Sequence, residues 1–178
     1  MHDSNRLAVK NLLPLLCTAA ILLALMPTAS LFPRFWKIFF CFPSAKISSL
    51  FLGSQCLPVH EGYLLLRSSI PIRVTQACNA ASFFILTLSL FVGLAVKYRK
   101  QTSRFIIFSI PLLAYPVTII ANSVRIIAGA YITNWTRAAL PENFWPSIHL
   151  AVGITVFLTF LTICYLLIAW RLNNAARI

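Results

Sequence analysis

Long apolar runs dominate the chain, and short polar or basic stretches separate them. Four runs reach the length of a membrane-spanning helix, about 17–25 residues. They cover residues 12–32, 80–96, 105–130 and 147–170. The pattern predicts an all-α polytopic membrane protein with about four to six transmembrane helices. Nothing marks a separate domain, so we expect one integral membrane domain over residues 1–178.

Two segments near the N-terminus need a closer look. The run at 12–32 is too long for the apolar region of a typical signal peptide, so we interpret it as a retained first helix. Residues 33–57 are rich in aromatics but are interrupted by Arg34, Lys37 and Pro43. Aromatic and basic residues mixed in this way suit the headgroup zone. An interfacial helix or a short re-entrant piece is therefore expected there.

A β-like segment is predicted near residues 62–76. In the stretch IPIRVT, residues 70–75, apolar side chains alternate with other residues at the period of a strand. Residues 63–66 can form its hairpin partner, with Arg67-Ser-Ser as the turn. Pro71 lacks an N–H group, which limits this strand to the edge of a sheet or to an irregular form.

Composition agrees with a membrane protein and indicates its orientation. The chain is 60% hydrophobic and 10% charged, with a mean hydropathy of +0.85 and a net charge of +12. The basic residues cluster beside apolar runs, so they indicate contact with the lipid bilayer and no nucleic acid partner. Four basic residues lie within residues 97–104, which predicts a cytoplasmic loop. Residues 33–79 and 131–147 then face the non-cytoplasmic side of the membrane.

Several classes of chemistry are excluded. The only acidic residues are Asp3, Glu61 and Glu142, too few for a mechanism with two carboxylates. The five cysteines show no zinc-ligand spacing, so we expect no metal and no cofactor. Neither a complete HExxH motif nor a GxSxG elbow is present. Cys41 and Cys56 share an outward segment and could form a disulfide, which spacing alone does not decide.

Three candidate site residues fall on the outward side. Cys78 precedes the second run, Arg125 lies near the outer end of the third, and His149 opens the fourth. Each has a structural alternative: a buried thiol, an interfacial cation and a polar helix anchor. Together they fit a thiol acyl-transfer site, with a nucleophile, an oxyanion stabiliser and a general base. Asn79 can cap the following helix, whose N-terminus favours a thiolate at Cys78.

These residues resemble motifs of the exosortase/archaeosortase family of membrane transpeptidases, and within it the subgroup called exosortase K. The similar stretches are EGYLLLRSSIPIRVTQAC, ANSVRIIAG and the histidine that opens the last run, within residues 43–155. The resemblance implies Cys78 as nucleophile, Arg125 as stabilising cation and His149 as acid/base. It implies supporting roles for Asn122 and Glu61. Asn79-Ala80 replaces the Ser-Gly that family members usually carry after the cysteine.

The resemblance also implies a role in protein sorting. Such enzymes cleave C-terminal tails of the PEP-CTERM type, which consist of a short motif, a membrane helix and a basic cluster. The partners would be membrane-anchored proteins that carry such a tail, and the intermediate would be a thioester. Two alternatives remain open from the residues themselves. One is a non-enzymatic transport or assembly subunit in which Arg125 binds an anion, and the other is a membrane cysteine acyltransferase.

Overall fold

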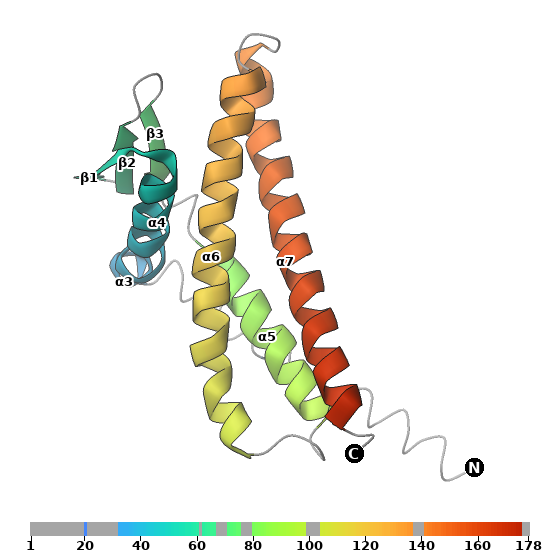
Figure 1. Cartoon of the computed structure of the whole chain (residues 1–178). Coiled ribbons are helices and arrows are strands. Elements are labelled where there is room, and N and C mark those ends of the chain that lie inside the picture. Colours follow the sequence, from blue (N-terminus) through green and yellow to red (C-terminus); the bar gives the residue numbers. More distant parts are fainter. Residues whose placement is uncertain are drawn as a thin grey trace. The chain divides into compact units, whose positions relative to one another are not determined.

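The structure is a computed structural model that describes residues 20, 32–60, 62–66, 71–75, 80–98, 104–136 and 141–175. Helices dominate it, with one small sheet (Figure 1). The predicted fold class, all-α with a short β segment, is confirmed. In chain order the elements are α3 (Pro33–Trp36), the π-helical turn η1 (Lys37–Cys41), α4 (Phe42–Leu52), β1 (Gln55–Val59), β2 (Gly62–Leu66), β3 (Pro71–Thr75), α5 (Ala81–Lys97), α6 (Arg104–Thr136), the 3₁₀ turn η3 (Glu142–Phe144) and α7 (Trp145–Ala175).

Three helical stretches of the described chain are long and apolar enough to cross a membrane. They are Arg34–Leu52, Ser109–Thr136 and Trp145–Arg171, and the shorter α5 is also apolar. A membrane protein is therefore confirmed. Apart from residues 20 and 32, the predicted first helix at 12–32 lies outside the described residues, so the count of four to six stays a prediction.

Residues 33–52 are helical throughout, which agrees with the expected helix in this segment. The sequence pattern does not reveal the π-helical turn, which lies between α3 and α4. Because this stretch is also long and apolar enough to span, its predicted interfacial or re-entrant placement stays a prediction.

Gly53 ends α4 and turns the chain toward β1. Its φ of 59° lies in the left-handed region that glycine adopts without steric cost. The N–H of Ser54 bonds the carbonyl oxygen of Ser49 at 2.9 Å, which satisfies one of the last helical carbonyls. The helix therefore ends at a defined point, and the sheet begins two residues later.

The sheet is antiparallel, in the order β1-β2-β3. Tyr63 lies opposite Val74 and Leu65 opposite Ile72, so the predicted hairpin is confirmed. The residues of its turn, 67–70, lie outside the described part. As Pro71 indicated, β3 is an edge strand. The third strand, β1, was missed because the segment QCLPV has no regular alternation and contains Pro58.

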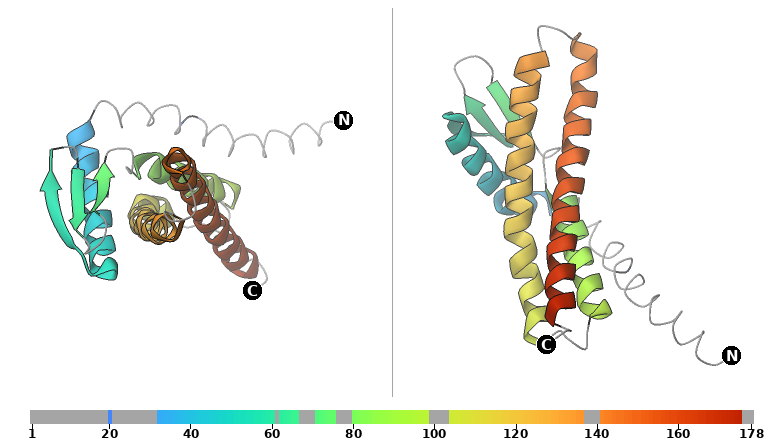
Figure 2. Two further views of the ribbon diagram at one scale, coloured as in Figure 1. Left: turned by 90° about the horizontal axis from the view of Figure 1, so that it is seen from above. Right: turned by 45° about the vertical axis from the view of Figure 1, so that its right-hand side comes forward.

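The chain divides into two compact units, which are described separately. The second unit holds residues 32–81 and 117–160. Within it, α4 covers one face of the sheet (Figure 2). Side chains from α4, β2, β3 and α6 form a common core there: Ala45, Leu52, Leu65, Val74 and Ile126.

Small residues bring α4 close to α6 in this unit. Ser44, Ser48 and Ser123 are at most 2% exposed. The hydroxyl of Ser48 donates to the carbonyl oxygen of Ser123 at 3.3 Å, and the hydroxyl of Ser123 lies 3.4 Å from the carbonyl oxygen of Ser44. Small residues that permit close approach and hydrogen bonding are typical of helix contacts within membranes.

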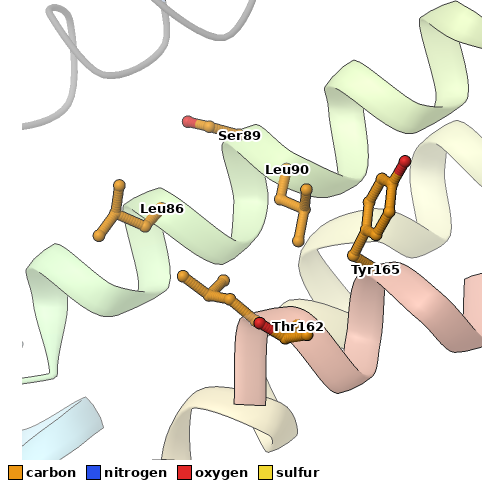
Figure 3. A pocket seen from close by; sticks show the side chains of 6 residues that line it. Leu86, Ser89, Leu90, Thr162 and Tyr165 are labelled. Carbon is orange, nitrogen blue, oxygen red and sulfur yellow. The ribbon is translucent and has the colours of Figure 1, made fainter. Parts of the chain in front are cut away.

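Of the described residues, the first unit holds 82–98, 104–116 and 161–175 together with residue 20. A cavity of about 420 Å³ lies between α5 and α7 (Figure 3). Its lining is mostly apolar and contains none of the predicted site residues: Leu86, Ser89, Leu90, Leu161, Thr162 and Tyr165. The two described catalytic candidates, Arg125 and His149, lie in the second unit.

Candidate active site

Arg125 lies on α6, and its side chain crosses to α7. A methyl group built on Gly153 would stand 2.9 Å from its Nε and 3.6 Å from its Cζ. The guanidinium carbon lies 5.5 Å from the centre of the Phe157 ring, which is the geometry of a cation–π contact. Gly153 and Phe157 are one helical turn apart, so they present one face to the arginine. Arg125 is half-buried in this slot.

His149 lies on α7, and its side chain extends to α6, in the opposite direction to that of Arg125. Its Nε2 is 3.2 Å from the hydroxyl oxygen of Thr133, within hydrogen-bond reach. A methyl group on Gly129 would stand 3.2 Å from its Nδ1. Thr133 therefore fixes one edge of the imidazole, and the absence of a side chain at Gly129 makes room for the other. The ring remains exposed.

The two crossings are reciprocal. Arg125 packs on the glycine four residues after His149, and His149 packs on the glycine four residues after Arg125. A separation of four residues places side chains on one face of a helix. Arg125 on α6 contacts Gly153 on α7, whereas Gly129, one turn later on α6, contacts His149, one turn earlier on α7. The two helices are therefore antiparallel here, as Figure 1 shows. The structure thus brings two of the three predicted catalytic residues together.

Within the described part of the chain, none of the described side chains is a carboxylate that could pair with Arg125. Of the three acidic residues, only Glu142 lies in that part. A guanidinium presents five N–H donors in a fixed fork and is always charged. Together with the Phe157 ring, the site therefore offers a cation held by apolar and aromatic contacts, which can bind an anionic or developing oxyanionic group.

Asn122 is fully buried on α6, three residues before Arg125. Its neighbour Ser123 faces α4, where it contacts Ser44 and Ser48. The side-chain carbonyl oxygen of Asn122 has no hydrogen-bond partner within the described residues, so burial of this carboxamide carries a free-energy cost.

The other predicted site residues, Cys78, Asn79 and Glu61, lie outside the described residues. In the sequence, Cys78 and Asn79 fall in the link between β3, which ends at Thr75, and α5, which begins at Ala81. Their predicted roles stay predictions.

Sequence reasoning missed four residues that shape this site. Thr133, Gly129, Gly153 and Phe157 all touch Arg125 or His149. The glycines carried a usable signal, because the chain has only five and each of these follows a candidate residue by four positions. Thr133 and Phe157 carried none, since both residue types are common in apolar helices.

Cys41 and Cys56 are not joined by a disulfide, so the bond that their shared segment allowed does not form. The thiol of Cys41 instead lies 3.9 Å from the carbonyl oxygen of Thr75, the last residue of β3. Cys56 lies in β1 and packs against the core of the second unit. Burial raises the pKa of the Cys56 thiol, and the nearby charge of Lys46 partly offsets this rise.

Comparison with known proteins identifies the family. The family model described as transmembrane exosortase matches residues 13–166, which is most of the chain. No curated protein and no solved structure matches it. The matched range includes Cys78, Arg125 and His149 together with all three strands. The chain belongs to the transmembrane exosortase family.

Proposed function

We propose that this protein is a membrane cysteine transpeptidase that cleaves the C-terminal sorting tails of exported proteins. Family membership supports a membrane transpeptidase in general. The observation that carries the proposal is the reciprocal packing of Arg125 and His149 on each other's helix, which holds a permanent cation and an imidazole in one place. Cys78 is the nucleophile of the proposed site.

The first chemical step is formation of a thioester. His149 accepts the proton of the Cys78 thiol, and the thiolate sulfur attacks the scissile carbonyl carbon. When the tetrahedral intermediate collapses, the C–N bond breaks and the imidazolium returns the proton to the leaving amine. The new C–S bond joins the exported protein to the enzyme, while the membrane helix and basic cluster of the tail depart.

The second step releases the product and restores the thiol. Water or an acceptor amine or lipid hydroxyl attacks the thioester carbonyl, with His149 as general base. The C–S bond then breaks, and the sulfur recovers a proton. An amine acceptor gives a new amide bond and thus transpeptidation, a lipid hydroxyl gives an ester, and water gives hydrolysis.

Arg125 stabilises the oxyanion in both steps. A preorganised donor at such a position contributes typically about 10²–10³ in rate. The Phe157 ring and the backbone at Gly153 hold the guanidinium before substrate arrives, so little reorganisation is needed during reaction. Asn122 supports the helix position of Arg125, Asn79 caps the helix after the nucleophile, and Glu61 supports the segment before it.

The proposed location is a bacterial or archaeal plasma membrane, with the site at its non-cytoplasmic face. The basic residues between α5 and α6 support this orientation, since positive loops stay in the cytoplasm. Arg125 is 21 residues from Arg104 along α6, about 30 Å at the rise of an α-helix. That length matches the hydrocarbon thickness of a bilayer, so the guanidinium is proposed to reach the opposite surface.

The test follows cleavage of a tagged reporter that carries a tail of motif, membrane helix and basic cluster from the same organism. Cys78→Ala should abolish processing, and Arg125→Ala or His149→Ala should lower its rate at least a hundredfold. Arg125→Lys keeps the charge but loses the planar fork, so it should restore only part of the rate. Cys164→Ala, on α7 and away from the proposed chemistry, is the matched control.

Full processing by Cys78→Ala would exclude the proposal. If that variant is active while Arg125→Ala is not, a non-enzymatic anion-binding role becomes the better explanation. Transfer of an acyl group without release of a peptide tail would instead favour a membrane acyltransferase.

A further inference from the structure

Strand β3 leaves main-chain groups unused at the outer edge of the sheet. It is the last strand in the order β1-β2-β3, and no other strand of the described chain lies beyond it. Arg73, at its centre, is exposed. Its side chain makes no hydrogen bond or ion pair within the described residues. An edge of this kind is a template for another extended chain.

The direction of these groups follows from the close approach of β2 and β3 at Gly62. A methyl group at Gly62 would collide with the carbonyl oxygen of Val74, so that oxygen points toward β2. Main-chain groups alternate in direction along an antiparallel strand, so those of Arg73 and Thr75 point away from β2. The carbonyl oxygen of Thr75 is already in contact with the Cys41 thiol on η1, at 3.9 Å, so it is not counted among the groups on offer. The outer edge therefore offers the N–H and C=O of Arg73 and the N–H of Thr75.

The opposite edge of the sheet is less suited to another strand. By the same alternation, the outward main-chain groups of β1 belong to Cys56 and Pro58, and Pro58 has no N–H to donate. The ammonium of Lys37 bonds the carbonyl oxygens of Val59 and His60 at 3.1 and 3.0 Å, where β1 ends. Proline and lysine are typical protections of a sheet edge.

We propose that the segment of the substrate that precedes the scissile bond binds as an added strand on the outer edge of β3. The occupant is the extended main chain of a polypeptide, paired with the outward groups of Arg73 and Thr75. This inference rests on the proposed function, in which Cys78 attacks that bond. Cys78 is three positions after Thr75, which is at most about 10 Å of extended chain. An added strand is thus anchored within reach of the nucleophile.

The positive charge of Arg73 at this edge indicates which side chains an added strand would carry. The Arg73 guanidinium lies on the face of the sheet away from the core, since Ile72 and Val74 point into it. Its charge is unpaired within the described residues, so it favours an acidic side chain on the added strand. Main-chain pairing provides most of the binding in strand addition, and side-chain contacts provide selectivity.

The experiment compares two substitutions at Arg73 in the full-length protein, with the tagged reporter as substrate. Arg73→Ala removes the guanidinium and keeps the outward N–H, whereas Arg73→Pro removes both. We expect Arg73→Pro to raise KM for tail cleavage about fivefold or more with kcat maintained, in line with loss of a hydrogen bond and steric exclusion of the strand. Arg73→Ala should change KM less than threefold, and only for tails that carry an acidic residue.

Folding of the variants is checked independently. A proline at an outward position should leave the thermal unfolding midpoint in detergent close to that of the parent. Val74→Pro removes an N–H directed at β2 and should lower this midpoint strongly, which calibrates the measurement. If Arg73→Pro is itself unfolded, the inference is tested from the substrate side instead. Proline is then placed at each successive position of the reporter tail, and cleavage by the parent enzyme is measured. Strand addition predicts that sensitivity to proline alternates at every second position before the scissile bond.

Equal kinetics for Arg73→Pro and Arg73→Ala in folded protein would overturn the inference, as would a proline scan without alternation. Cys78→Ala is measured in parallel. Loss of cleavage in that variant together with an unaffected Arg73→Pro would reject strand addition while the proposed function stands. Cleavage by Cys78→Ala would reject the proposed function itself.

Discussion

Arg125 lies across Gly153, with Nε 2.9 Å from the position that a methyl group on that glycine would occupy. A Cβ atom is essentially never found so close to another heavy atom, so any side chain here displaces the guanidinium. The glycine therefore belongs to the arginine's binding slot as much as the Phe157 ring does. The position of one catalytic candidate thus depends on a residue of the facing helix.

Gly153→Ala is expected to lower the rate of tail cleavage by between about ten- and a hundredfold, because displacement of a catalytic group by about 1 Å can cost 10²-fold. Alanine favours helix over glycine by up to about 1 kcal/mol, so α7 should not be weakened. The measurement is cleavage rate beside the thermal unfolding midpoint. Ile154→Ala, at an exposed neighbouring position, is the control. Normal cleavage by Gly153→Ala would show that Arg125 needs no fixed position.

Gly129→Ala tests the other half of the reciprocal contact. The added methyl would stand 3.2 Å from Nδ1 of His149, so the ring needs to move by only a few tenths of an ångström. We expect a rate loss of about threefold, smaller than for Gly153→Ala, and a larger loss for Gly129→Val. The graded series is measured by cleavage of the same reporter. An effect of Gly129→Ala that exceeds the effect of Gly153→Ala would contradict the geometry.

Thr133 positions His149 through the 3.2 Å contact between its hydroxyl and Nε2. Thr133→Val keeps the shape of the side chain and removes the hydroxyl. We expect the cleavage rate to fall about two- to tenfold, the worth of one neutral hydrogen bond. Thr133→Ser should restore most of the rate and the parental pH–rate profile. If serine and valine behave alike, the hydroxyl does not orient the imidazole.

The sequence singled out candidate residues whose types are unusual for their surroundings. An arginine deep in an apolar run and a histidine at a helix start are visible against a membrane background, as Arg125 and His149 were. The facing contacts were not predictable, because which turn of α6 meets which turn of α7 depends on how the helices pack. Thr133 and Phe157 acquire their roles only from that register.

The same distinction holds for the fold. The β2–β3 hairpin was predicted from alternation around Ile72 and Val74, and the edge position of β3 from Pro71. Strand β1 was not predicted, because the segment after Gly53 has no strand pattern of its own. It becomes a strand by pairing with β2. The π-helical turn η1 likewise has no local signal, since an α-helix would suit the same aromatic residues.

Cys56 provides a pH-dependent test of the sheet. Burial raises the pKa of its thiol, so less thiolate is present at a given pH than for an exposed cysteine. With the other four cysteines replaced, the midpoint of its alkylation rate against pH should lie above the ordinary value of about 8.5. Lys46 lowers this pKa, so Lys46→Gln should move the midpoint higher still. A midpoint below the ordinary value, or a downward shift in the lysine variant, would contradict this packing.

Ala45 tests whether α4, the sheet and α6 form one core. Its side chain has no exposure and lies in the cluster with Leu65, Val74 and Ile126. Ala45→Leu adds three carbon atoms at a fully buried position, so we expect destabilisation of about 1–3 kcal/mol. Because Ile126 is the next residue after Arg125 on α6, the same substitution should also lower tail cleavage. Leu50→Ala, on the exposed face of α4, should change neither quantity. If Ala45→Leu leaves both unfolding and cleavage unchanged, α4 does not pack against the helix that carries Arg125.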